Sequence, residues 1–256
     1  MPILSSMRER YHYLFYPALL VMITAVLFFR VGTFDFLAID DAMHTEKNPY
    51  VAPFTATNLK RFWTEPYENA FTPLTYTLWM VQAYFAELPP EAGAARKQLL
   101  FPEGLKFNPG AFHIANLLTH AAAAVAAYFL LQTLFHQPLV AFLGAVLFAV
   151  HPLQVESVSW ITGFRDVLAG FLGFLTLLFY FFHCQKRSPL LYGIATLLFL
   201  ASTLAKSSSL SIIPMALAIG IIVFKRPWRL ALTEVAAWIV LIIPLFHIFS
   251  TLNNSV

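Results

Sequence analysis

Seven apolar runs, separated by short polar breaks, constrain this chain more than any other feature of its sequence. They lie at residues 11–29, 110–135, 138–150, 167–184, 189–205, 207–224 and 230–250. A helix needs ~20 apolar residues to cross the ~30 Å hydrocarbon core of a membrane. Charged residues make up only 11% of the chain, whereas an ordinary soluble domain carries ~25%. We therefore expect a single membrane domain, residues 1–256, that is all-α and polytopic with about seven transmembrane helices.

The segment 30–109, between the first two runs, is mixed in character and holds eight of the 16 prolines. Within it, residues 73–88 would form a helix about 24 Å long at 1.5 Å per residue, which is short for a span. One stripe of this helix is apolar at three- and four-residue spacing, formed by Leu74, Leu78, Val81, Phe85 and Leu88. The pattern predicts an amphipathic helix that lies at the membrane interface, with a true span as the alternative.

Basic residues predict the orientation of the spans. If the N-terminus lies inside, the short inner loops carry Arg8, Arg10, Lys186, Arg187, Lys225, Arg226 and Arg229. The short outer loops then carry only Arg165 and Lys206, in agreement with the positive-inside rule. This orientation places the segment 30–109 and the links around residues 151–166 and 206–209 on the outer side. Glu234 lies about one turn from the inner surface, where we expect an interfacial position.

Two adjacent carboxylates, Asp40 and Asp41, follow the first apolar run. Such a pair can act as a general base, orient an acceptor hydroxyl, or bind a divalent cation such as Mg or Mn. The alternative is a solvated loop with an Asx turn, since paired acids are common in loops.

The link between the third and fourth runs contains four ionisable residues, His151, Glu156, Arg165 and Asp166. Ionisable groups near the hydrocarbon are costly unless they pair or line a wet cavity. The link therefore predicts a functional cavity, and the alternative is a structural ion pair of Arg165 with Glu156 or Asp166.

Lys206 precedes three serines where two further runs meet on the same side. A lysine with hydroxyls at a helix start can hold a phosphate, although a snorkelling lysine with capping serines explains the pattern equally well. His113 and Asn116 share one helix face near the outer surface and can border the same cavity, whereas His120 suits an inter-helix hydrogen bond. The lone Cys184 forms no intrachain bridge, and the thinly spread net charge of +3 excludes nucleic acid as an expected partner.

Five short motifs, taken in their order along the chain, match the pattern of a known family. They are Asp40-Asp41 with Asn48-Pro49, Thr72-Pro-Leu-Thr75, His113-Ile-Ala-Asn116-Leu-Leu-Thr-His120, His151-Pro-Leu-Gln-Val-Glu156-Ser-Val-Ser-Trp160 with Arg165-Asp166, and Ala205-Lys206. This pattern resembles the membrane part of the transmembrane and tetratricopeptide-repeat O-mannosyltransferases and their bacterial relatives. These belong to the GT-C glycosyltransferases. The resemblance covers roughly residues 33–226, and the segment from His151 to Trp160 is its most specific piece.

The resemblance implies a seven-helix GT-C-like fold with an interfacial helix in its first outer loop. It also implies transfer of a sugar from a polyprenyl-phosphate carrier to an acceptor hydroxyl on a protein or glycan, at the outer face of the membrane. Asp40 or Asp41 would be the general base of an inverting displacement. Arg165 and Lys206 would hold the lipid phosphate, with His151, Glu156, His113 and Asn116 around the pocket. We expect the inner membrane of a bacterium, with the site facing the periplasm.

The chain also departs from the family pattern. Relatives often carry Trp-His-Pro-Leu-Thr where this chain has Ala70-Phe-Thr-Pro-Leu-Thr75, so the histidine of that motif is missing. The tetratricopeptide repeats are absent from this sequence, which suggests a minimal or truncated enzyme. The alternative function is a non-catalytic membrane subunit of a larger complex built on the glycosyltransferase scaffold. A transporter is disfavoured, because no inverted repeat is visible.

Overall fold

The computed structural model describes residues 2–37, 40–96, 101 and 104–253, and over these ranges it contains helices and no strand. The longer helices are α1 (Pro2–Phe28), α5 (Pro109–Phe135), α6 (Pro138–Ala149), α8 (Phe164–Lys186), α9 (Pro189–Ala205) and α11 (Trp228–Asn253). Residues 207–223 are divided into η4 (Ser207–Ser211), α10 (Ile212–Ala218) and η5 (Ile219–Val223). The remaining short elements are η1 (Phe29–Thr33), η2 (Ala42–Glu46), α2 (Ala56–Thr64), α3 (Pro73–Ala86), α4 (Pro90–Ala95), α7 (Leu153–Ser159) and η3 (Ile161–Gly163).

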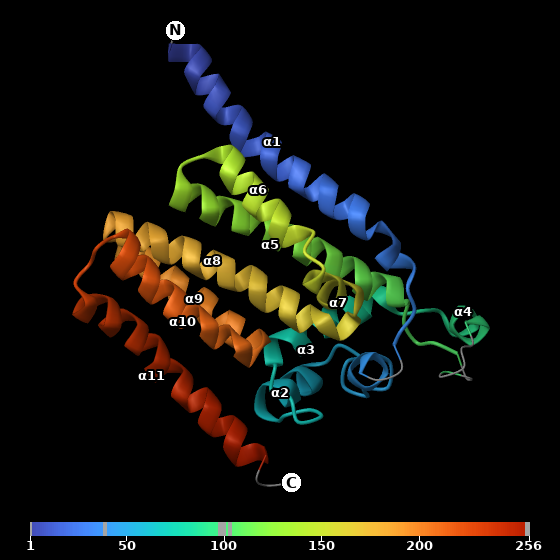
Figure 1. Cartoon of the computed structure of the whole chain (residues 1–256). Coiled ribbons are helices and arrows are strands. Elements are labelled where there is room, and N and C mark those ends of the chain that lie inside the picture. Colours follow the sequence, from blue (N-terminus) through green and yellow to red (C-terminus); the bar gives the residue numbers. More distant parts are fainter. Residues whose placement is uncertain (1, 38–39, 97–100, 102–103, 254–256) are drawn as a thin grey trace.

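The long helices run back and forth as an antiparallel bundle (Figure 1). Tight turns reverse the chain because His136 and Arg187 end α5 and α8 with left-handed φ angles of 55° and 54°. A proline then opens each following helix at its first position, where the missing N–H has no intrahelical partner to lose. In the resulting bundle, α8 packs against α9 on one side and α5 on the other.

The bundle has two ends that differ in construction (Figure 1). We call one the loop end, where the described residues of 29–108 gather with residues 150–163 and 206–211. The other is the turn end, where the chain reverses at 136–137, 187–188 and 224–227. The polar segments that the sequence places on one side of the membrane therefore share one end of the molecule.

Three helical stretches are long and apolar enough to cross a membrane: Leu14–Thr33, Pro109–Phe135 and Ile161–Lys186. The pair α6 and α7, bent by 65°, gives a fourth candidate if it forms one broken span. Helix α9 and the stretch Ser207–Val223 are apolar but shorter. The chain is thus an all-α protein with three or four candidate spans among its described residues, and the expected seven spans are not confirmed.

Helix α3 lies across the loop end and packs on α5, α8 and α9. Its buried face carries Tyr76, Trp79, Met80 and Ala83, not the apolar stripe that the spacing identifies. Two residues of that stripe point away from the protein, since Val81 is 37% exposed and Phe85 is 78% exposed. The other three, Leu74, Leu78 and Leu88, are partly buried against the core of the loop end. The stripe therefore faces outward only at Val81 and Phe85, and the interfacial position stays a prediction.

A buried ion pair closes the turn end. Arg226 donates two hydrogen bonds to the carboxylate of Glu234, and Glu234 also contacts Tyr180 and His183. The hydroxyl of Tyr192 donates to the backbone carbonyl of Glu234. Glu234 therefore ties α8, α9 and the turn before α11 together, which goes beyond the simple interfacial role expected from the sequence.

Candidate functional site

Asp41 joins the first long loop to the start of α8. Its side chain is fully buried, and its two carboxylate oxygens accept hydrogen bonds from the backbone N–H groups of Leu37 and Thr162, each at 3.0 Å. Burial raises the pKa of Asp41, while these two hydrogen bonds oppose the rise. The contact with Thr162 brings the acidic pair to the same end of the bundle as the segment that begins at His151. Since both of its oxygens already accept from backbone N–H groups, the Asp41 side chain has a structural role: it holds the loop against the segment before α8.

Asp40 differs from its neighbour because its side chain is only half-buried. Its backbone carbonyl accepts from the N–H of His44 at 2.9 Å. No hydrogen bond or ion pair to its carboxylate occurs in the described part of the chain. Of the two predicted acids, Asp40 therefore has the carboxylate that is free to take a proton from an incoming group.

His44 and Tyr76 form a buried pair beside Asp40, and neither belongs to the predicted site. His44 Nδ1 and the Tyr76 hydroxyl lie 2.7 Å apart within a cage of aromatic rings that includes Tyr67 and Trp79. Burial, with the charge of Arg165, lowers the pKa of His44 to about 4, although the charge of Asp40 opposes the shift. Burial also raises the pKa of Tyr76 above its usual range. Both groups are thus neutral near pH 7, so this hydrogen-bonded pair carries no charge beside Asp40.

Arg165 faces this pair from the first turn of α8. Its positive charge lowers the pKa of both His44 and Tyr76. Arg165 Nε donates to the carbonyl of Thr162 at 3.4 Å, and the guanidinium carbon lies 5.9 Å from the centre of the Trp79 ring. No acid within the described ranges pairs with it, so the guanidinium remains available to an anionic ligand.

Lys206 follows the end of α9 and pairs with Asp166 of α8. Asp166 therefore takes Lys206 as its partner, and the structural pairs of Arg165 that the sequence left open are not formed. The hydroxyl of Thr75 donates to the carbonyl of Ala205 at 3.0 Å, which fixes α3 beside this lysine. Lys206 thus lies at the loop end with Arg165, but its charge is already balanced.

The other predicted site residues are placed around this centre and have structural contacts. Asn116 Nδ2 donates to the carbonyl of Trp160 at 2.6 Å, which joins α5 to the segment before α8. His113 is 1% exposed and faces the ring of Phe34. His120 Nε2 lies 3.0 Å from the carbonyl of Ala149, in agreement with the expected inter-helix hydrogen bond.

His151 and Glu156 have exposed side chains. His151 Nδ1 accepts from the N–H of Leu153, the first residue of α7, at 3.2 Å. Neither residue hydrogen-bonds to Asp40, Asp41 or Arg165 among the described residues, so their predicted binding roles stay predictions.

A bound metal ion would need several acidic, histidine or cysteine side chains close together. No group of three or more His, Cys, Asp or Glu side chains that could hold a metal ion occurs in the part of the chain that the structure describes. Asp41 is a poor cation ligand, because backbone N–H groups occupy both of its oxygens. Asp40 is the remaining acid of the pair for an Mg or Mn ion.

Stretches of the chain are similar to enzymes named protein O-mannosyl-transferases. Protein O-mannosyl-transferase TMTC2 of Homo sapiens is 35% identical over 80 residues, which are 31% of this chain and 10% of that protein. TMTC1 of Homo sapiens is 42% identical over 74 residues, 28% of this chain and 8% of that protein. F38B6.6 of Caenorhabditis elegans is 31% identical over 117 residues, 44% of this chain and 16% of that protein.

These matches show a similarity to glycosyltransferases over part of the chain only. The matched stretches span between 8% and 16% of the curated relatives. No protein-family profile matches the chain, and no solved structure does either.

The pKa of His44 predicts that acid destabilises the loop end. In an unfolded chain a histidine takes up a proton near pH 6.5, whereas buried His44 does so only at about 4. The unfolded state therefore binds more protons between these pH values, and the native state loses stability as pH falls through them. The difference corresponds to about 3 kcal/mol, lost between pH 7 and pH 4.

Thermal unfolding of the wild type and of His44→Gln across that pH range measures this effect. Glutamine keeps a partner for the Tyr76 hydroxyl but does not titrate. The groups that face His44, namely Tyr76, Arg165 and Asp40, are present in both proteins and cancel in the difference. Parallel stability curves for the two proteins would contradict the assignment.

Proposed function

We propose that this chain is a glycosyltransferase, or the membrane part of one, that transfers a sugar from a polyprenyl-phosphate carrier to an acceptor hydroxyl. The single observation that supports this is the placement of a carboxylate and a guanidinium, neither with an ion-pair partner among the described residues, beside the same aromatic cage. Asp40 accepts from the N–H of His44 through its backbone carbonyl, and the guanidinium carbon of Arg165 lies 5.9 Å from the centre of the Trp79 ring, which contacts the rings of His44 and Tyr76. The relatives are named O-mannosyltransferases, which suggests mannose as the sugar and a protein as the acceptor.

In the proposed reaction, Asp40 removes the proton of the acceptor hydroxyl while the hydroxyl oxygen attacks C1 of the sugar. The bond between C1 and the carrier phosphate oxygen breaks, and the configuration at C1 inverts. Arg165 stabilises the negative charge that develops on the leaving phosphate. A positive group placed where charge develops is a large contributor to catalysis in a pocket with little water.

Asp41 has a positioning role in this proposal. Its hydrogen bonds to Leu37 and Thr162 hold the loop that carries Asp40 against the start of α8, which carries Arg165. A base and a cation on different segments must be held in register, because small misplacements of reacting groups reduce rates strongly. We propose that this end of the bundle faces the outside, which in a bacterium is the periplasmic side of the inner membrane.

Reconstituted vesicles provide the test. The purified full chain is incorporated into liposomes with polyprenyl-phosphate mannose labelled in the sugar, and a Ser/Thr-containing peptide is added. We expect label on the peptide and release of polyprenyl phosphate, and no label on a peptide in which alanine replaces every Ser and Thr. Absence of both products would refute the proposal. Purification of the chain in a stable complex, without sugar transfer, would favour the alternative function as a non-catalytic membrane subunit.

A further inference from the structure

The same four-residue pattern recurs at the three chain reversals of the turn end. A basic residue, a polar residue, a proline and an apolar residue follow one another at 136–139, 187–190 and 225–228, as His-Gln-Pro-Leu, Arg-Ser-Pro-Leu and Lys-Arg-Pro-Trp. The basic residue that opens each copy is exposed and has a left-handed backbone, with φ angles of 55°, 54° and 49°. The apolar residue that closes each copy is also exposed, by 56% at Leu139, 71% at Leu190 and 59% at Trp228. Each reversal therefore presents one basic and one apolar side chain to the surroundings.

The basic residues at these positions are not the ones that the backbone favours. A left-handed φ is unfavourable for a residue with a Cβ atom, whereas glycine adopts it freely. Arg187 and Lys225 lie there nonetheless. The helix dipole favours a cation at a helix C-terminus and explains part of this choice. It does not explain why an exposed apolar side chain follows three residues later, at Leu190 and Trp228.

The second and third reversals are joined by a buried cluster. Arg226, the neighbour of Lys225, donates a hydrogen bond to Sγ of Cys184 in the last turn of α8, at a distance of 3.0 Å. Arg226 also pairs with Glu234, so this acid already has a counter-ion. Because α8 ends directly before Arg187, the contact with Cys184 brings the two basic reversals onto one surface of the turn end.

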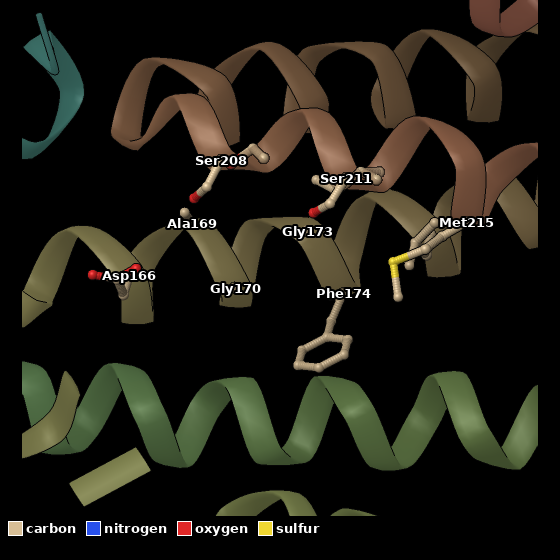
Figure 2. A pocket seen from close by; sticks show the side chains of 11 residues that line it. Asp166, Ala169, Gly170, Gly173, Phe174, Ser208, Ser211 and Met215 are labelled. Carbon is tan, nitrogen blue, oxygen red and sulfur yellow. The ribbon is translucent and has the colours of Figure 1, made fainter. Parts of the chain in front are cut away.

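The two ends of α8 differ in how their charges are balanced. Near the loop end, Asp166 borders a groove of about 240 Å³ between α8, η4 and α10 (Figure 2), and its carboxylate is paired with Lys206. At the turn end, none of the described acids pairs with the exposed cations Lys186, Arg187, Lys225 and Arg229. Several cations without a counter-ion in the protein attract an anionic ligand.

The apolar residues beside these cations indicate which anion is bound. Arg229 lies against an aromatic ring, with its guanidinium carbon 5.5 Å from the centre of the Trp228 ring, and that tryptophan is largely exposed. Tryptophan is enriched at the level of the lipid headgroups, where one side of the ring meets hydrocarbon. A soluble anion complements the cations alone, whereas a lipid with an anionic head and hydrocarbon chains also complements Leu190 and Trp228.

We propose that the turn end binds an anionic phospholipid, with its phosphate shared by Arg187 and Lys225 and its acyl chains against Leu190 and Trp228. This end lies opposite the loop end, so the lipid belongs to the inner leaflet, whose surface is negatively charged. The proposal does not depend on sugar transfer, because none of these residues belongs to the candidate site.

The double variant Arg187→Gly with Lys225→Gly separates lipid binding from folding. Glycine removes each cation and adopts the left-handed backbone without strain, so the thermal unfolding midpoint in non-ionic detergent should stay close to that of the wild type. Binding of phosphatidylglycerol with a fluorescent label on its acyl chain is measured on the purified full chain at low salt. It should weaken about fivefold for each cation removed and about 30-fold for both.

Three control variants match these changes. Asn69→Gly replaces a residue with a φ of 57° at the loop end without changing the charge, and Lys60→Gln removes an exposed cation there. Both should bind the lipid as the wild type does. Arg187→Lys with Lys225→Arg keeps both charges and should retain binding, since a phosphate accepts from either cation.

Competition identifies the ligand. Unlabelled phosphatidylcholine, which has no net charge, and glycerol phosphate, which has no acyl chains, should each displace the labelled lipid only at a large excess. Unchanged binding in the double glycine variant, or displacement by phosphatidylcholine mole for mole, would overturn the proposal. Displacement by equimolar glycerol phosphate would reduce the site to one for a soluble anion and overturn it as well. Loss of binding together with a large fall of the unfolding midpoint would assign Arg187 and Lys225 to folding instead.

Discussion

Replacing Asp40 by asparagine is expected to reduce sugar transfer by about 10²–10⁴-fold while the protein stays folded. The half-buried carboxylate of Asp40 has no protein partner among the described residues, so its loss breaks no contact that holds the loop. Asparagine has nearly the same size but cannot take the proton of an acceptor hydroxyl. The rate of label transfer from polyprenyl-phosphate mannose, measured beside the thermal unfolding midpoint, checks both parts of the expectation.

Two other acids of the same loop serve as comparisons. Asp35 is exposed, and Asp35→Asn should transfer sugar at the wild-type rate. Asp41→Asn should instead lower the unfolding midpoint, because an amide offers one acceptor oxygen to the two N–H donors of Leu37 and Thr162. Full activity of Asp40→Asn would remove Asp40 as the base. A strong loss of activity in Asp41→Asn at unchanged stability would assign the base to Asp41.

Much of the bundle could be predicted because the residues at which its helices begin and end are set by local sequence signals. Helix α9 begins at Pro189 and ends at Ala205, as the apolar run does, and α5 begins one residue before its run. Proline at the first helical position and a turn of two polar residues are signals that need no knowledge of distant parts of the chain. The break of residues 207–223 into three helical forms has no such signal in the apolar pattern.

The candidate site could be predicted only in part, because its contacts join distant segments. The acidic pair, Arg165 and Lys206 are visible as rare charges in an apolar sequence. The division of labour between Asp40 and Asp41 depends on the N–H of Thr162, 121 residues away along the chain. Tyr76 was not predicted as a site residue, because its hydroxyl reaches His44 only through the folding of the loop.

The ion-pair partner of Lys206 also depends on how distant segments pack, and it could not be predicted from the sequence. Sequence proximity favours pairs of Arg165 with its neighbours Asp166 or Glu156. In the bundle, α8 and α9 lie antiparallel, so the end of α9 meets the start of α8 and Asp166 pairs with Lys206. Arg165, one residue earlier, points to a different side of α8, since successive helical residues are ~100° apart.

Removing the carboxylate of Glu234 is expected to cost about 3–5 kcal/mol of folding free energy. Arg226 has a side chain that is 3% exposed, and its two bonds to Glu234, 2.7 and 2.9 Å long, are its charged contacts at the turn end. In Glu234→Ala the guanidinium remains buried without its counter-ion, and Tyr180 and His183 lose a partner as well. Unfolding of the purified protein in detergent, followed by denaturant titration or by heat, measures the loss.

The exposed pair of Arg61 and Glu65 provides the control within the same chain. Its side chains are 46% and 52% exposed at an N–O distance of 2.9 Å, and Glu65→Ala should cost less than about 1 kcal/mol. The double variant Arg226→Met with Glu234→Leu should regain most of the stability, because burying two apolar groups leaves no charge without a partner. A loss below about 1 kcal/mol in Glu234→Ala would show that water reaches Arg226 and that the pair does not hold the turn end together.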